Sequence, residues 1–171
     1  MVSFFENNPE LHTRGATSGG VKTDHKKSTD ISINPNDLQQ PGYEVFGEYF
    51  SQLRGCFEDY KQQWPFLHTF LDRVHLGAFN LQRYEPGGHF ANLHSERTHI
   101  SKLHRVFAFM TYLNDVENGG ATDYHYYDLK IKPEAGKTLI WPAEWTHCHT
   151  GSVVEEGKKY IATGWMSFPH D

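Results

Sequence analysis

The chain has few cysteines and no long apolar run. Its 171 residues include only Cys56 and Cys148, which form no C-x-x-C pair, so neither a disulfide framework nor a zinc knuckle is expected. No apolar stretch is long enough to cross a bilayer, and the first residues lack the basic start and apolar core of a signal peptide. We therefore expect a soluble, cytoplasmic protein with reduced cysteines and no membrane partner.

Concentrated positive charge is also missing. The chain has 21 Asp and Glu against 16 Lys and Arg, which gives a net charge of −5, and no basic cluster stands out. Nucleic acid is therefore not expected as a partner. No internal repeat is present either, and the length suits a single compact domain with a real core. Aromatic residues make up 15% of the chain, which suits a β-rich interior.

One segment has the pattern of a helix. Residues 43–63 follow a Pro-Gly pair and end before Pro65, and apolar residues recur in them at steps of three and four. Cys56 falls on this apolar stripe, where it is expected to act as a small core residue. A second, shorter helical segment is expected at residues 66–74.

The chain divides by composition into an arm and a domain. Residues 1–40, rich in Gly, Ser, Thr, Asn and Pro toward their end, are expected to form an irregular N-terminal arm, with residues 27–33 as one ordered strand in it. Residues 41–171 are expected to form a single domain. Within it, residues 41–75 would give helical support and residues 76–171 a β core.

Five segments of the second half have the pattern of strands. They are residues 80–84, 105–114, 127–133, 136–142 and 159–168, which are apolar or alternating and are separated by turn residues. No helical period lies between them. Strands this closely spaced indicate an antiparallel sandwich or jelly roll, and the expected fold class is mainly β with supporting helices (α+β).

Two spacings in this region suggest a metal site. His94 and Glu96 are two residues apart, and a pair of histidines, His147 and His149, follows about fifty residues later, with Lys159 beyond them. In an extended segment, residues two apart project to the same side, so His94 and Glu96 would both reach one metal. Two imidazoles and one carboxylate hold iron(II) on one face and leave positions open. A solvated polar loop is the alternative for an isolated H-x-E triplet.

Residues 78–168 resemble the iron(II)- and 2-oxoglutarate-dependent oxygenases, in particular the small prolyl-4-hydroxylase-like group. The order and spacing of several segments carry this resemblance. In chain order these segments are Tyr84-Glu-Pro-Gly, His94-Ser-Glu, Arg105 through Tyr112-Leu-Asn-Asp, Gly119-Gly-Ala-Thr, Ile131-Lys-Pro-Glu-Ala-Gly, Trp141-Pro, and His149 to Trp165. The resemblance implies a double-stranded β-helix (jelly-roll) core.

The resemblance also implies roles for particular residues. His94, Glu96 and His149 would be the catalytic iron ligands, because in this group the cation, here Lys159, usually stands ten positions after the second histidine. His147 would then orient a ligand or pack. Lys159 would bind the distal carboxylate of 2-oxoglutarate, since a buried dicarboxylate needs a fixed positive partner. The implied cofactors are Fe(II), 2-oxoglutarate as cosubstrate, and O2.

Further residues would surround the cosubstrate and the substrate. Tyr84, Tyr112 and Thr163 match positions whose hydroxyl groups line the 2-oxoglutarate pocket in the family. Trp165 matches an aromatic residue close to the metal, and Arg105 lies where some relatives have a residue near the substrate.

The chain departs from the commoner family pattern at two positions. Glu96 replaces an aspartate, and Ala121 follows the Gly-Gly turn where relatives often carry glutamate. A carboxylate ligand of either kind argues against halogenation, so hydroxylation of a C–H bond is expected, with a peptide or a small molecule as substrate and prolyl hydroxylation as the family-level expectation. A non-catalytic metal- or 2-oxoglutarate-binding sensor and a zinc hydrolase stay as alternatives. The sequence gives no oligomeric state.

Overall fold

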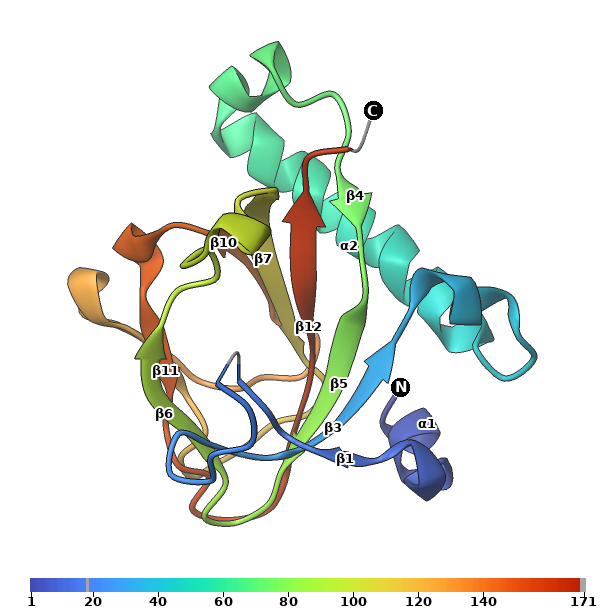
Figure 1. Cartoon of the computed structure of the whole chain (residues 1–171), viewed down its shortest axis with the longest axis vertical. Helices are drawn as coiled ribbons and strands as arrows, with labels where there is room; N and C mark the ends of the chain where they lie inside the picture. The colour runs from blue at the N-terminus through green and yellow to red at the C-terminus, as the bar shows by residue number, and fades with distance from the viewer. Residues whose placement is uncertain (18, 170–171) are drawn as a thin grey trace.

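Two antiparallel sheets form the framework of the protein (Figure 1). The computed structural model describes residues 1–17 and 19–169. A seven-stranded sheet has the order β1-β3-β5-β12-β7-β10, with β4 paired to β12, and a five-stranded sheet has the order β2-β6-β11-β8-β9. The strands are β1 (Thr13–Arg14), β2 (Lys26–Lys27), β3 (Thr29–Ile33), β4 (His75–Leu76), β5 (Phe79–Tyr84), β6 (His89–His94), β7 (Arg105–Tyr112), β8 (Thr122–Tyr124), β9 (Leu129–Ile131), β10 (Thr138–Pro142), β11 (His149–Gly151) and β12 (Lys159–Ser167).

The sheets confirm the expected fold class and most of the expected strands. Strands β5, β7, β10 and β12 lie within two residues of the segments predicted from the sequence. The segment at residues 127–133 contains only the three residues of β9. Strands β6, β8 and β11 belong to the five-stranded sheet and are short or polar, so the pattern of apolar residues did not predict them.

The longest strand, β12, lies in the middle of the larger sheet. It pairs with β5 on one side and β7 on the other, so that Thr163 faces Asn80 and Met110. Its Gly164 fits a tight contact, because a Cβ atom there would lie 2.7 Å from Cζ of Phe109. This close packing fixes the register of the strand that begins with Lys159.

Helix α2 (Glu44–Gln63) confirms the predicted long helix and packs on the larger sheet (Figure 1). Its buried residues Phe46 and Phe57 form edge-to-face contacts with Phe79 and Phe107, at ring separations of 5.4 and 5.8 Å. Such aromatic pairs stabilise the contact beyond simple burial. Among the described residues, no helix combines the length and the apolar character needed to span a bilayer.

The expected second helix at residues 66–74 is wrong. The structure has a short 3₁₀ segment, Pro65–Thr69, and no helix after it. Phe66 and Phe70 are both exposed, and only Leu67, Leu71 and Val74 of this segment pack toward the core. A helix this short is only marginally stable in water. The other 3₁₀ segments are Pro9–Leu11, Pro35–Gln39, Ile100–Lys102, His125–Tyr127 and Trp145–His147.

The N-terminal segment is more regular than its composition indicates. Helix α1 (Val2–Asn7) buries Phe5, which is 1% exposed, against the core. The expected strand in the arm is present as β3, which pairs with β5, and β2 pairs with β6. The expectation of an irregular arm is therefore corrected: these residues add strands to both sheets, and their backbone groups are satisfied by partners far away in the sequence.

Candidate metal and cosubstrate site

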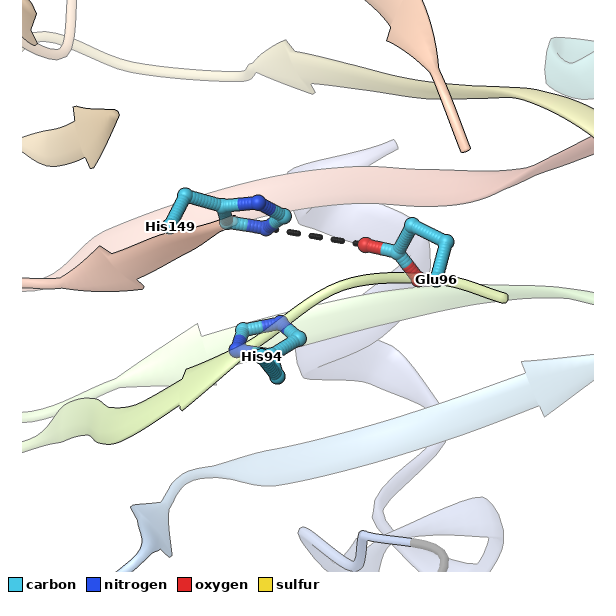
Figure 2. A group of neighbouring side chains, drawn as sticks. All are labelled: His94, Glu96 and His149. Atoms are coloured by element: carbon cyan, nitrogen blue, oxygen red, sulfur yellow. Dashed lines mark ion pairs between the residues drawn. The ribbon is translucent and has the colours of Figure 1, made fainter. Parts of the chain in front are cut away.

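Three side chains form a candidate metal centre at one end of the smaller sheet. His94 ends β6, Glu96 follows it, and His149 begins β11. The register of β6 and β11 places His149 opposite His94. One ligand atom from each of the three side chains lies within 4.8 Å of the other two, and Figure 2 shows the three side chains gathered together. The structure thus brings together the three ligands that the sequence predicted.

Backbone hydrogen bonds prepare both imidazoles for a metal. Nδ1 of His94 is 2.8 Å from the carbonyl oxygen of Asn92, and Nδ1 of His149 is 2.9 Å from that of His147. With Nδ1 donating, Nε2 carries a free lone pair. Burial, together with the neighbouring His149, lowers the pKa of His94 to about 4, so this ring is neutral at pH 7. Two imidazoles and a carboxylate fit iron(II).

Two neighbours hold the Glu96 carboxylate in position. The indole Nε1 of Trp165 donates a hydrogen bond of 2.6 Å to Oε2 of Glu96. The other carboxylate oxygen, Oε1, lies 3.5 Å from Nε2 of His149 (Figure 2). The guanidinium of Arg105 stacks 3.5 Å from the centre of the Trp165 ring and donates to the backbone carbonyl of Glu96 at 3.1 Å. One carboxylate oxygen is thus occupied and the other faces the histidines.

His147 lies outside the metal-ligand group. It ends a 3₁₀ turn, and its Nε2 is 3.2 Å from the hydroxyl group of Tyr127. Its Nδ1 is 3.0 Å from the Thr146 hydroxyl group. Only its backbone carbonyl serves the site, by accepting the hydrogen bond from His149. The geometry therefore favours His149 over His147 as the third ligand.

Lys159 is a buried cation without a carboxylate partner in the part of the chain that the structure describes. Its side chain is 3% exposed, and its Nζ donates to the carbonyl oxygen of Gly120 at 2.9 Å and lies 4.5 Å from the centre of the Tyr84 ring. Burial lowers the pKa of Lys159 to about 8. An unpaired buried ammonium is costly, and a bound anion would offset that cost. The neighbouring Lys158 points outward and pairs with Glu85.

The Gly-Gly turn supplies the carbonyl group that Lys159 contacts. Gly119 and Gly120 both have a positive φ, +81° and +69°, and a Cβ atom on Gly119 would lie 2.1 Å from the carbonyl oxygen of Val153. Only glycine fits Gly119 without backbone movement. Ala121 is buried directly after this turn, so the position often held by glutamate in relatives carries no charge here.

The predicted hydroxyl residues divide between the cavity and the core. Tyr84 and Thr163 line the same cavity as Lys159, and they donate to Oε1 of Gln82 at 2.7 Å and to the carbonyl oxygen of Phe109 at 2.9 Å. Tyr112 is not among the lining residues. Its hydroxyl group is 2.7 Å from Oγ1 of Thr122, which does line the cavity.

A single cavity of about 730 Å³ joins the metal-ligand group to Lys159. Sequence reasoning missed part of its wall, including Thr122, Gln82 and a buried ion pair between Lys26 and Asp30, with 2.6 Å between Nζ and Oδ2. Gln82 donates to Oδ2 of Asp30 at 3.3 Å. The sequence did not predict Lys26 or Asp30 as cavity residues, because the N-terminal segment reaches the cavity only through long-range strand pairing.

Comparison with known proteins gives a consistent result. The family model described as the 2OG-Fe(II) oxygenase superfamily matches residues 79–167. The chain is 29% identical over 124 residues to "Probable prolyl 4-hydroxylase 9" of Arabidopsis thaliana, which covers 57% of this chain and 43% of that protein. It is 31% identical over 93 residues to "Prolyl 4-hydroxylase subunit alpha-3" of Homo sapiens, which covers 48% of this chain and 17% of that protein. The chain thus spans less than half the length of these curated relatives.

Solved structures share the fold. A viral collagen prolyl hydroxylase from Paramecium Bursaria Chlorella virus-1 has a TM-score of 0.63 at 22% identity, over 83% of this chain and 79% of that one. A prolyl hydroxylase from Trichoplax adhaerens, solved with a hypoxia inducible factor peptide, has a TM-score of 0.71 at 15% identity, over 97% and 76%. At these identities the likeness establishes the fold alone, a double-stranded β-helix core with supporting helices.

Proposed function

The chain belongs to the 2OG-Fe(II) oxygenase superfamily, and from this premise we propose that it hydroxylates a proline in a peptide substrate. The family uses ferrous iron, 2-oxoglutarate and dioxygen. In the reaction, 2-oxoglutarate is oxidised to succinate and carbon dioxide, one oxygen atom of O2 enters succinate, and the other enters the product as a hydroxyl group. The iron and the cosubstrate supply this oxidising chemistry, and the protein supplies binding and placement.

The observation that carries the proposal is one cavity with two complementary ends. His94, Glu96 and His149 lie at one position in it and the unpaired Lys159 at another. A metal at the first position and a cation at the second match the two ends of a dicarboxylate that chelates iron through its keto acid end. The chemistry of a zinc hydrolase does not require the buried cation at the second position.

Each residue has a specific task in this proposal. His94, Glu96 and His149 would hold the iron, and Trp165 would keep Glu96 bound through one oxygen by occupying the other. Lys159 would bind the distal carboxylate. Arg105, whose guanidinium stacks on the Trp165 ring, also lines the cavity.

Tyr84 and Thr163 would line the cosubstrate region beside Lys159. Tyr112 lies behind the cavity wall and would hold Thr122, a lining residue, in place through their hydroxyl contact. Burial raises the pKa of both tyrosines, so their hydroxyl groups stay protonated and able to donate.

The peptide substrate and the prolyl specificity rest on the relatives, whose names describe prolyl 4-hydroxylases. A small molecule is the other substrate that the sequence leaves open, and a non-catalytic sensor is the alternative function. A cytoplasmic location stays a prediction from the sequence.

The test is turnover of proline-containing peptides with ferrous iron, 2-oxoglutarate and air, followed by mass spectrometry. The proposal predicts a gain of one oxygen atom on proline, with succinate formed in equal amount. His149→Ala should abolish turnover, and His147→Ala is the matched control that should keep it. Turnover that survives in His149→Ala but not in His147→Ala would refute the assigned ligand set. Binding of iron and 2-oxoglutarate without turnover of any substrate would favour the sensor.

A further inference from the structure

The wall of the cavity is positively charged, although the chain as a whole is acidic. The cavity is lined by six of the chain's 16 Lys and Arg residues. Among the described residues, only two of its 21 Asp and Glu residues, Asp30 and Glu96, line it. The six cations are Arg14, Lys22, Lys26, Lys102, Arg105 and Lys159. Positive charge is therefore concentrated at the cavity, while the net charge of −5 places an excess of carboxylates on the remaining surface.

Two of the cations and both carboxylates already have tasks. Lys26 is neutralised by Asp30 at 2.6 Å, and both side chains are buried. Lys159 is assigned to the cosubstrate and Glu96 to the metal. Over the described part of the chain, the remaining four cations have no carboxylate within ion-pair distance, 4.0 Å. They are Arg14, Lys22, Lys102 and Arg105.

These four cations lie on two segments that meet at the cavity. Arg14 and Lys22 belong to the N-terminal segment, which in Figure 1 (blue) lies between β6 and β5. Lys102 lies in the connection between β6 and β7, and Arg105 is the first residue of β7. Arg14 and Lys22 are exposed, Lys102 and Arg105 are half-buried, and Arg105 contacts the backbone of the metal ligand Glu96. Positive charge thus extends from the exposed rim toward the metal.

We propose that the preferred substrate is an acidic peptide, with Asp or Glu residues flanking the hydroxylated residue. The proposal rests on the proposed hydroxylase function and adds the charge of its substrate. Four unpaired cations along a path from rim to metal match an extended ligand with several carboxylates, whereas a small acid would contact one or two of them. A cavity lined by charges of one sign raises the local concentration of an oppositely charged ligand and its association rate.

The test is direct binding, which needs no turnover. Fluorescently labelled proline peptides of equal length, flanked by Glu, Gln or Lys, are titrated by anisotropy under anaerobic conditions into the protein loaded with iron and 2-oxoglutarate. The double variant Lys22→Glu/Lys102→Glu reverses charge at the cavity. The matched control is Arg54→Glu/Lys132→Glu, because these two exposed cations lie outside the cavity lining and form no ion pair with the described residues.

The proposal predicts that the Glu peptide binds at least about tenfold more tightly than the Lys peptide at low salt, with a preference that weakens as salt is added. The cavity double variant should lose or reverse this preference, and the control should keep it. Equal binding of the three peptides, or a preference that persists in the cavity variant, would overturn the proposal. So would equally tight binding of free glutamate, or tighter binding of a single-stranded oligonucleotide of equal charge.

Turnover of the same peptides separates this proposal from the function on which it rests. Selective binding of the Glu peptide without hydroxylation would refute the prolyl hydroxylase assignment and keep the acidic preference. Hydroxylation of all three peptides with equal kcat/KM would refute the acidic preference and keep the prolyl hydroxylase assignment.

Discussion

Replacement of Lys159 by methionine should stabilise the metal-free protein while it removes cosubstrate binding. The pKa of Lys159 falls from 10.5 to about 8 on folding, because burial disfavours the charged form. A folded-state pKa below the unfolded value means that the folded protein holds the proton less well, so the charge destabilises folding at pH 7. At 1.36 kcal/mol per pKa unit, the destabilisation is about 3 kcal/mol. Loss of the hydrogen bond to Gly120 costs about 1 kcal/mol. The expected net gain is about 2 kcal/mol.

Urea denaturation of the apo proteins measures this difference. At pH 7 the Lys159→Met variant should have the larger free energy of unfolding. The difference should shrink as the pH rises from 8 toward 10.5, because the wild type alone gains stability there as its lysine loses the proton in the folded state. Iron alone should stabilise both proteins, because both keep His94, Glu96 and His149, whereas 2-oxoglutarate added to the iron-loaded proteins should stabilise only the wild type further. A variant that is less stable at pH 7, or a difference that does not change with pH, would refute the description of Lys159 as an unpaired buried cation.

Three further predictions follow from the geometry. The affinity for 2-oxoglutarate should be constant between pH 6 and 7 and fall by up to tenfold per pH unit above about pH 8, because binding then requires Lys159 to take up a proton. Calorimetry measures this affinity, and an affinity that rose or stayed level above pH 8 would contradict the assignment of Lys159. Trp165→Phe should weaken iron binding by about 10- to 100-fold, because the variant keeps an aromatic ring beside Arg105 but loses the hydrogen bond to Glu96. An unchanged Kd for iron would argue against this positioning role of Trp165. Gly164→Ala should destabilise the fold by about 1–3 kcal/mol in urea denaturation, since the added Cβ would lie 2.7 Å from Phe109, and a neutral result would contradict the tight packing of β12.

The metal-ligand group was predictable because its information is local. His94 and Glu96 are neighbours in the sequence, and His149 has a fixed spacing from Lys159. The choice between His147 and His149 needed the resemblance. In the structure it depends on the 3₁₀ turn that ends at His147 and on the pairing of β11 with β6. No periodicity in the sequence indicates that turn.

The support of Glu96 was outside the reach of sequence reasoning. The sequence shows only that Glu96 stands where the commoner family pattern has an aspartate. The structure shows in addition that Trp165, 69 residues away, fixes one oxygen of the carboxylate. A hydrogen bond of this kind depends on the register of β12, which propensities do not reveal. Tyr112 shows the same limit, since its place one layer behind the cavity depends on contact with Thr122.

The N-terminal segment was the largest error in the prediction of the fold. Its Gly- and Ser-rich composition favoured an irregular arm, but tertiary pairing overrides composition when a sheet edge is available. Lys26 and Asp30 are buried only because β2 and β3 pair with strands of the two sheets. The charge of the cavity therefore emerged only from the assembled fold.

The most direct test of the central claim is an anaerobic titration of the apo protein with ferrous iron and then 2-oxoglutarate, followed by visible absorption. Bidentate chelation of iron by the keto acid gives a weak charge-transfer band. The account predicts this band in the wild type and in His147→Ala, and its loss in His149→Ala. Bound iron without a band in the wild type, or a band that persists in His149→Ala, would contradict it.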